Sequence, residues 1–288
     1  MKDLMTTYRD AARNRVAVGH FNVSDLPALK GVVAAAQDLR VPVVVGVSEG
    51  ERKFLGDKQI SAMVKSFNDE GGIPVYLNAD HTHTLESAVA AANAGFDSIV
   101  YDLSSLPIEE NIRQTKVAIK VLKEINPSIL IEGEIGDIGT GSNIHEVAPD
   151  LSKGMTTPGQ AKQFVEATGV DILAPAVGNM HGMMRSMIQG EVKKHLDIER
   201  IAEIKRATES FMTLHGGSGT NDDDFVKAIA AGINIIHVNT ELRVAWRRSL
   251  DQALSKYPDE VVPYNILPAV VEATREVARA RLKLFNML

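Results

Sequence analysis

The chain has 288 residues, of which 44% are hydrophobic and 24% charged, and its formal net charge is -6 at pH 7. This composition is typical of a globular protein with a large core, and the negative charge gives no basic surface for nucleic acid or an anionic membrane, so we expect a small-molecule partner or another copy of the chain. The chain has no cysteine, which excludes disulfides and thiolate metal sites and leaves nitrogen and oxygen ligands for any transition metal.

The first residues of the chain, 1–8, contain no apolar segment of the kind that forms a secretory signal. No later apolar run approaches the roughly 20 residues of a membrane-spanning helix. We therefore expect a cytoplasmic protein.

An Ala-rich helix, a turn with Gly or Pro and a short β-branched run recur together along the chain. The turn Gly suits a helix C-cap, and the unbroken apolar run suits a strand that is buried on both faces of a parallel sheet. The repeated unit is found at residues 32–46, 88–101, 164–174 and 228–238. Apolar runs of this kind predict strands at residues 16–21, 42–47, 74–79, 98–102, 129–133, 171–177, 211–215 and 233–238.

Eight strands that alternate with helices predict an α/β fold, the (β/α)8 TIM barrel, with residues 1–288 as a single catalytic domain. An open, doubly wound sheet is the alternative, but no Gly-x-Gly-x-x-Gly motif follows the first strand. Residues 136–159 are polar and Gly-rich and predict a long loop over the mouth of the barrel. Residues 267–288 predict an extra amphipathic helix, which would pack on the barrel or on a neighbouring subunit.

Nearly every predicted strand is followed by a polar residue. Active sites of such barrels lie at the C-terminal ends of the strands, so these residues are expected to share one site. Any one of them could be an ordinary turn residue, but the set contains three histidines and three carboxylates. In chain order the residues are Asn22, Ser48, Asp80 with His81, Asp102, Glu134, His181, His215, and Asn239 with Thr240. We predict that Asn22, Ser48, Asp102 and Asn239 contact a substrate.

Three of these strand-end residues are histidines that could hold a metal ion. Three neutral imidazoles with an open fourth position suit a catalytic divalent metal, and we predict His81, His181 and His215 as its ligands. His83 competes with them, because His-x-His is itself a metal-binding pattern, although a residue at a helix start would point elsewhere.

The other histidines have simpler interpretations. His20 and His237 lie within predicted strands and are expected to be satisfied histidines of the core or the site. His145 and His195 are expected to be solvated, in a loop or on a surface helix.

Two further features of the strand ends suggest chemistry. Asp80 is next to a predicted ligand and could serve as a general acid or base, since a nearby divalent ion changes the pKa of a carboxyl group. Residues 216–219 (Gly-Gly-Ser-Gly) offer backbone N–H groups and a hydroxyl, and Thr240 is expected to be the N-cap of the next helix. Together these features predict a phosphate site.

Taken in order, the motifs resemble those of the class II, metal-dependent ketose-bisphosphate aldolases. The resemblance runs nearly end to end. It rests on residues 19–23 (GHFNV), 48–50 (SEG), 80–81 (DH), 101–104 (YDLS), 107–111 (PIEEN), 132–136 (EGEIG), 178–182 (GNMHG), 215–219 (HGGSG) and 238–243 (VNTELR).

The resemblance implies a carbon–carbon lyase that reversibly cleaves a phosphorylated ketose. It implies Zn²⁺, or a similar ion such as Mn²⁺ or Co²⁺, on the three histidines, with Glu134 as an alternate ligand and Asp80 exchanging a proton with the oxygen at C4. The ion would act as a Lewis acid that stabilises an enediolate, so that no Schiff-base lysine is required. The implied phosphate-binding residues are Gly182, Arg185, Gly217, Ser218 and Thr240. The family also implies a homo-oligomer, a dimer or larger.

The sequence departs from the family pattern at three places around the expected donor. A usual Glu-Asp pair, whose Glu is linked to the donor's proton, is replaced by Ser142 and Asn143, so we predict Glu146 as the substitute, with His145 as its rival. A usual Asn is replaced by His237, for which we predict a catalytic role, and a usual Gln by Gly46. These changes raise an alternative, in which the donor is unphosphorylated dihydroxyacetone and the substrate is fructose 6-phosphate.

Two other classes compete with the aldolase. A metal hydrolase is suggested by the His-x-His pattern, but such enzymes usually carry that pair on the first strand, whereas here it follows the third. A non-catalytic relative is suggested by the missing loop Glu, but it would leave three converging imidazoles without a role.

Overall fold

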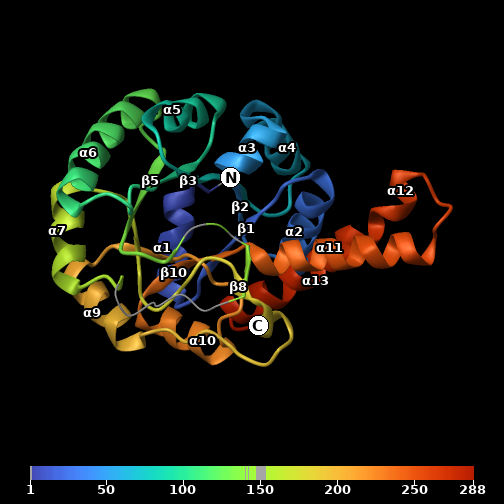
Figure 1. The fold of residues 1–288 in the computed structure, drawn as a ribbon. Coiled ribbons are helices and arrows are strands. Elements are labelled where there is room, and N and C mark those ends of the chain that lie inside the picture. Colours follow the sequence, from blue (N-terminus) through green and yellow to red (C-terminus); the bar gives the residue numbers. More distant parts are fainter. Residues whose placement is uncertain (1, 140, 142, 147–153) are drawn as a thin grey trace.

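Eight parallel strands close into a barrel in the order β1-β10-β9-β7-β5-β4-β3-β2 (Figure 1). The computed structural model describes residues 2–139, 141, 143–146 and 154–288. The barrel strands are β1 (Val18–Asn22), β2 (Val43–Ser48), β3 (Val75–Thr82), β4 (Ser98–Tyr101), β5 (Leu130–Ile135), β7 (Ile172–Pro175), β9 (Phe211–Leu214) and β10 (Ile233–Val238). All eight predicted strands are therefore confirmed, with ends shifted by a few residues, and the doubly wound alternative is wrong.

The register of the barrel brings the strand ends to one rim. Asn22 of β1 pairs with Gly46 of β2, and Ser48 at the end of β2 pairs with Asp80 of β3. The polar residues that the sequence places after apolar runs therefore lie side by side at the C-terminal mouth, where barrels carry their active sites.

Helices surround the barrel and one closes its N-terminal end. The helices are α1 (Leu4–Asn14), α2 (Leu26–Leu39), α3 (Glu49–Leu55), α4 (Asp57–Glu70), α5 (Leu85–Ala94), α6 (Ile108–Ile125), α7 (Pro158–Thr168), α8 (Arg185–Ile188), α9 (Ile198–Thr208), α10 (Asp222–Ala231), α11 (Thr240–Lys256), α12 (Pro263–Ile266) and α13 (Pro268–Phe285). Leu4 and Tyr8 of α1 pack against Val44 and Tyr76 inside the barrel, and a larger apolar core fills the space between the strands and the outer helices.

The predicted C-terminal helix is α13, and it packs on the barrel's own helices. Gly31 of α2 lets the backbone of α13 approach closely, because a Cβ at this position would collide with Thr274. Arg275 of α13 forms an ion pair with Asp38 at the end of α2, with Nη2 and Oδ2 2.8 Å apart. The far ends of α11 and α13, with α12 between them, project away from the barrel (Figure 1).

The predicted long loop contains an element that the sequence did not indicate. Residues Ile144–His145 form β6, which pairs in parallel with β8 (Met183–Met184) in a separate small sheet. The end of the predicted loop is helical, because α7 begins at Pro158. Within the residues that the structure describes, no helix is long and apolar enough to span a membrane.

Candidate active site

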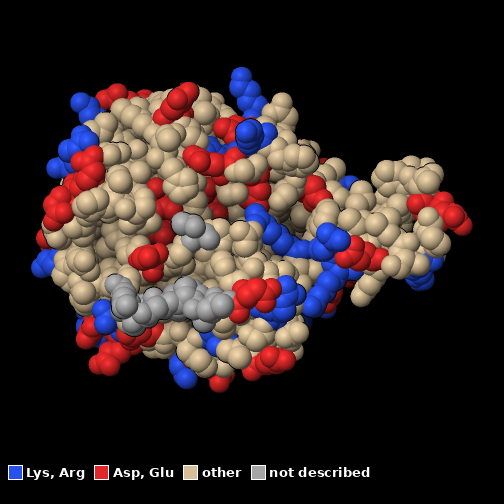
Figure 2. All heavy atoms as spheres, viewed as in Figure 1, with Lys and Arg blue, Asp and Glu red and all other residues tan. Residues whose placement is uncertain are grey.

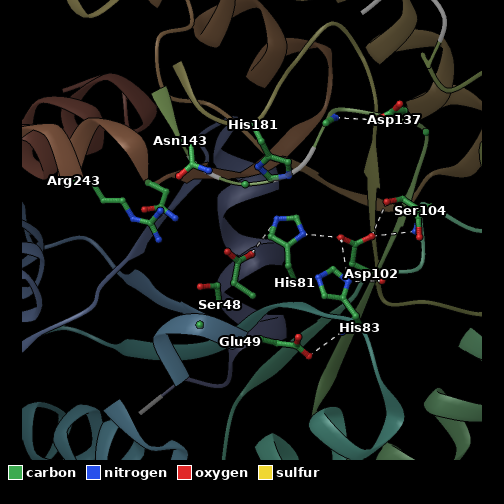
Figure 3. A pocket seen from close by; sticks show the side chains of 17 residues that line it. Ser48, Glu49, His81, His83, Asp102, Ser104, Asp137, Asn143, His181 and Arg243 are labelled. Atoms are coloured by element: carbon green, nitrogen blue, oxygen red, sulfur yellow. Dashed lines mark hydrogen bonds and ion pairs between the residues drawn. The ribbon is translucent and has the colours of Figure 1, made fainter. Parts of the chain in front are cut away.

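A cavity of about 720 Å³ opens at the C-terminal mouth of the barrel (Figure 3). Its lining includes Ser48, Asp80, His81, His83, Asp102, Asn143, His181, Asn239 and Arg243. A smaller cavity of about 20 Å³ shares Asp80, His81, His181 and Asn239 with it and adds Asn22, Gly182, His215, Ser218, His237 and Thr240. This volume suffices for about one water-sized particle, such as a metal ion or a water molecule.

The structure brings together the four residues that were predicted as metal ligands. One potential ligand atom each from His81, Glu134, His181 and His215 lies within 4.8 Å of the others. Nε2 of His81 and Nδ1 of His215 face each other at 3.0 Å. The competing residue, His83, is not in this cluster, and its Nδ1 lies 3.0 Å from the backbone oxygen of Asp102.

Two carboxylates hold the outer nitrogens of the facing imidazoles. Nδ1 of His81 is 2.8 Å from Oδ2 of Asp102, and Nε2 of His215 is 2.5 Å from Oε1 of Glu132. When a ring donates its outer N–H to a carboxylate, the inner nitrogen keeps its lone pair for a metal, and such carboxylate–histidine pairs are typical of metal sites. Without a metal ion, a proton on Nε2 of His81 bridges the 3.0 Å to Nδ1 of His215, and a bound cation would take the place of that proton.

The electrostatics of the cluster also favour a cation. Burial lowers the pKa of His81, but Asp80, Asp102 and Glu134 outweigh burial and raise it to about 10. Burial, and then the neighbouring His81, lower the pKa of His215 to about 3, so that this ring is a neutral ligand. Burial and the Asp102 carboxylate raise the pKa of Glu134 well above its usual range.

Oε2 of Glu134 also indicates that these residues suit a metal ion. It is buried without a hydrogen-bond partner, 3.6 Å from Nδ1 of His81 and 3.8 Å from Nδ1 of His215. A nitrogen and oxygen donor set with an unpartnered buried carboxylate oxygen fits a divalent transition metal.

Asp80 and His81 are consecutive in β3, yet both side chains line the same cavity. Consecutive side chains of a regular strand point to opposite faces. The register of β3 against β4 shifts between Ala79 and Thr82, and His81 has a φ of 43°. This irregularity directs both side chains to one site, which is a common function of β-bulges near active sites.

Asp80 is held as an ionised carboxylate with one oxygen unpartnered. Its Oδ2 accepts a hydrogen bond of 2.9 Å from Asn22, while Oδ1 has no hydrogen-bond partner and lies 3.3 Å from Nδ1 of His237. Burial raises the pKa of Asp80, but His81 and His237 outweigh burial and hold it well below its usual range. The free oxygen is therefore able to accept a proton.

The predicted phosphate site is only partly assembled as expected. Asn239 is the N-cap of α11, and Thr240 is the first residue of the helix, so the predicted cap was wrong by one residue. The N–H of Gly217 donates to the carbonyl of His237 at 2.9 Å and is not available to a ligand. Gly182, Ser218 and Thr240 do line the small cavity.

Glu146 and Arg185 lie together on the small sheet side of the mouth. The two exposed side chains form a two-pronged ion pair, with Arg185 Nη2 and Nε 2.6 Å and 3.0 Å from Oε1 of Glu146. Glu146 does not line the large cavity.

His145 was expected to be solvated, which is wrong. It is half-buried, and its Nε2 lies 3.1 Å from the carbonyl oxygen of His181. Ser142 lies outside the described residues.

The sequence did not identify two residues that support the site. Glu132 contacts His215, and its inward direction could have been read from the spacing 132 and 134, since alternate strand residues share a face. Buried Lys194 donates to the carbonyls of Met180, Gly182 and Gly216 at 2.7 to 2.9 Å and so joins two of the loops at the mouth. The sequence around Lys194 carries no signal for this contact.

A family model described as "Fructose-bisphosphate aldolase class-II" matches residues 2–287. The chain belongs to the class II fructose-bisphosphate aldolase family. It is 32% identical over 286 residues to a probable fructose-bisphosphate aldolase of Bacillus subtilis (strain 168), covering 98% of this chain and 96% of that protein. It is 30% identical over 299 residues to a fructose-bisphosphate aldolase of Thermus caldophilus, with coverage of 96% and 95%.

Solved structures agree with this assignment. The crystal structure of the YdjI aldolase from Escherichia coli K12 has a TM-score of 0.82 and 30% sequence identity, and the match covers 98% of this chain and 96% of that one. As a class II aldolase, the protein catalyses reversible aldol cleavage and is a carbon–carbon lyase of a metal-dependent family. The names of the relatives do not favour the unphosphorylated donor, and family membership leaves the hydrolase and non-catalytic alternatives without support.

Proposed function

We propose that this class II aldolase cleaves fructose 1,6-bisphosphate or a closely related phosphorylated ketose, with Zn²⁺ on His81, His181 and His215. One observation carries the proposal: two facing imidazoles, each backed by a carboxylate, next to the unpartnered oxygen of Glu134. The names of the relatives support the substrate class.

A divalent ion on these ligands would act as a Lewis acid on the ketone and its neighbouring hydroxyl, which stabilises the negative charge left when the C3–C4 bond breaks. The remaining chemistry belongs to the chain. Asp80 would take the proton from the C4 hydroxyl on Oδ1, and Asn22 would hold the opposite oxygen of the carboxylate still. Asp102 and Glu132 would fix the tautomers and ring orientations of His81 and His215.

The basic face next to the mouth supports a phosphorylated substrate. Figure 2 shows basic side chains gathered between the mouth and the projecting helices. A pocket of about 520 Å³ lies there, lined in part by Arg185, Thr240, Arg243, Arg247 and Arg248. The guanidinium groups of these arginines would bind the oxygens of a substrate phosphate through charge-assisted, bidentate hydrogen bonds.

The ion pair between Arg185 and Glu146 suggests how the donor's proton is handled. A phosphate that binds Arg185 competes with Glu146 for the same guanidinium group. We infer that phosphate binding frees the Glu146 carboxylate, which then exchanges the donor's proton.

The test is a comparison of kcat/KM for fructose 1,6-bisphosphate, tagatose 1,6-bisphosphate and fructose 6-phosphate at equal metal content. The proposal expects either bisphosphate to be preferred over fructose 6-phosphate by at least about tenfold. A clear preference for fructose 6-phosphate would contradict it and identify an unphosphorylated donor.

We also infer a homo-oligomer, a dimer or larger. Tyr257, Val261 and Tyr264 on the projecting end of α11 to α13 are between 50% and 84% exposed, and large exposed apolar groups of this kind often mark subunit contacts. The molar mass in solution, measured by light scattering for the wild type and Tyr264→Glu, tests this inference. The single domain over residues 1–288 and the cytoplasmic location stay predictions.

A further inference from the structure

Two histidine rings stack inside the barrel, directly below the mouth. His20 of β1 and His237 of β10 pair in the parallel ladder, and their ring centroids are 3.4 Å apart with an angle of 1° between the planes. Both side chains are buried. The sequence predicts a catalytic role for His237 and only an ordinary core or site role for His20, and neither the fold nor the metal cluster requires the pair.

The ring of His20 is fixed at its edge by a buried hydrogen bond. Its Nε2 is 3.0 Å from Oδ1 of Asn78, and the amide of Asn78 donates to Oγ of Ser98 at 2.8 Å. This chain of contacts crosses from β1 to β3 and β4 and is buried throughout. Because Asn78 donates to Ser98 with its amide nitrogen, its oxygen accepts from Nε2–H of His20, which fixes the tautomer.

Gly46 provides the space for this ring. A Cβ at Gly46 would collide with Cε1 and Nε2 of His20 and would lie 3.0 Å from its Nδ1. The residue has an ordinary backbone conformation, so its lack of a side chain serves the ring of His20 and not a turn. A side chain at position 46 would therefore displace the His20 ring.

The stacked ring of His237 contacts the reaction machinery. Its Nδ1 is 3.3 Å from Oδ1 of Asp80, its other face lies against His215 with centroids 4.1 Å apart, and it lines the small cavity. His237 is thus held between His20 and His215, and its orientation toward Asp80 depends on both neighbours.

A second metal ion does not explain the pair. His20, Asp80 and His237 offer atoms within 4.8 Å of one another. However, the lone pair of an imidazole nitrogen lies in the ring plane, and two parallel planes 3.4 Å apart cannot both contain one ion. Neutral stacked rings fit the surroundings, since burial lowers the pKa of His20 to about 3.

We propose that His20 is a positioning residue, which acts through ring stacking to hold His237 at the donor end of the site beside Asp80, and that the absence of a side chain at Gly46 makes room for it. The inference rests on the proposed aldol cleavage and deepens it, because it assigns the shape of the donor pocket to a unit of three residues. A displacement of about 1 Å at a reacting group can cost on the order of 100-fold in rate.

The test is a double-mutant cycle in the metal-loaded protein with fructose 1,6-bisphosphate. We expect His20→Ala to lower kcat by about 10- to 100-fold with KM changed by less than about threefold. The double variant His20→Ala/His237→Ala should be no slower than His237→Ala alone, because His20 acts through His237. Multiplicative losses, or a His20→Ala enzyme with wild-type kcat, would overturn the inference.

Two conservative variants separate stacking from mere folding. His20→Phe keeps a flat ring and loses the bond to Asn78, whereas His20→Gln keeps a polar group for Asn78 and loses the ring. We expect His20→Phe to retain at least about a third of kcat and His20→Gln to behave like His20→Ala, and the reverse order would contradict a stacking role. Gly46→Ala should lower kcat in the same way as His20→Ala, because the new Cβ would displace the His20 ring. Gly159→Ala, where a Cβ meets no atom within 4 Å, is the matched control.

A crystal structure of His20→Ala keeps this test independent of the substrate. The expected result is a rotated His237 ring with Nδ1 no longer next to Oδ1 of Asp80, and an unmoved ring would overturn the inference. If the wild type cleaves no ketose but the ring rotates in the variant, the proposed function fails while the positioning role stands.

Discussion

Glu132 and His215 form a buried contact inside the barrel, with Oε1 and Nε2 2.5 Å apart and side chains that are 3% and 1% exposed. The second oxygen of Glu132 accepts a hydrogen bond of 2.7 Å from Thr213. The carboxylate therefore fixes which nitrogen of His215 carries the proton and leaves Nδ1 for a metal ion. This contact links a residue of β5 to the residue that follows β9, and it is the support on which the proposed metal site depends.

Replacing Glu132 should weaken metal binding without removing a ligand. We expect Glu132→Gln to lower metal affinity by about 10- to 100-fold, the usual effect of losing such a supporting carboxylate. Competition with a chromophoric chelator measures the affinity, and Glu109→Gln, an exposed position on α6, is the matched control. An unchanged metal affinity in Glu132→Gln would show that the carboxylate does not prepare His215 for metal binding.

Asp80 should be required for turnover and dispensable for metal binding. We expect Asp80→Asn to lower kcat by about 100-fold or more, since an amide cannot accept the C4 proton, while Asn22 still has an oxygen to bind. Retro-aldol kinetics and metal analysis of the same samples separate the two effects. Loss of the metal from Asp80→Asn would instead make Asp80 a ligand.

The sequence predicted the framework of this site better than its internal contacts. The eight strands and the positions of His81, His181 and His215 follow from apolar runs and the residues directly after them, which are local properties of the chain. The bulge at His81 and the contact between Glu132 and His215 depend on how strands far apart in the sequence align across the barrel. No local pattern encodes such an alignment.

The errors at the mouth have the same origin. His145 was expected in solvent because its neighbours in sequence are polar, but β6 pairs with β8 and brings the ring to the carbonyl of His181. Gly217 was expected to offer a free N–H, but strand β10 takes that donor through the carbonyl of His237. In both cases a tertiary partner decides what the residue does.

Lys194 should be important for stability although it resembles a surface lysine in the sequence. Burial lowers the pKa of its amine to about 7, although the Glu241 carboxylate opposes this fall. The three carbonyl acceptors match the ammonium form, because only that form has three N–H donors. We expect Lys194→Met to lower the free energy of unfolding by roughly 3 kcal/mol, since three buried carbonyls lose their donor.

Urea unfolding of Lys194→Met and of its exposed neighbour Lys193→Met tests this expectation at constant metal. The control should lie within about 0.5 kcal/mol of the wild type, as is usual for surface substitutions. Equal stabilities of the two variants would mean that water replaces the ammonium group without cost.

Asp97 should make stability depend on pH below neutrality. Burial raises the pKa of its carboxyl group from the ordinary 3.8 to about 6, although the N–H of Leu77 donates to it. Because the folded pKa lies above the unfolded one, the native state binds more protons between these values, and the stabilisation is complete at low pH and lost as pH rises through about 6.

Asp97→Asn cannot titrate and keeps an oxygen for Leu77. We expect its free energy of unfolding, relative to the wild type, to rise by at most about 3 kcal/mol from pH 4 to pH 7. Urea unfolding of metal-free protein across this range measures the difference, with the exposed Asp259→Asn as control. A difference that stays constant with pH would show that Asp97 has an ordinary pKa.

The most direct test of the account is cleavage of fructose 1,6-bisphosphate by protein stripped with EDTA and then supplied with Zn²⁺, Mn²⁺ or Co²⁺. We predict that the stripped protein is inactive, that at least one ion restores cleavage, and that the restored activity saturates at one ion per chain. Full activity in the stripped protein, with metal analysis confirming its absence, would contradict the proposed metal centre at His81, His181 and His215.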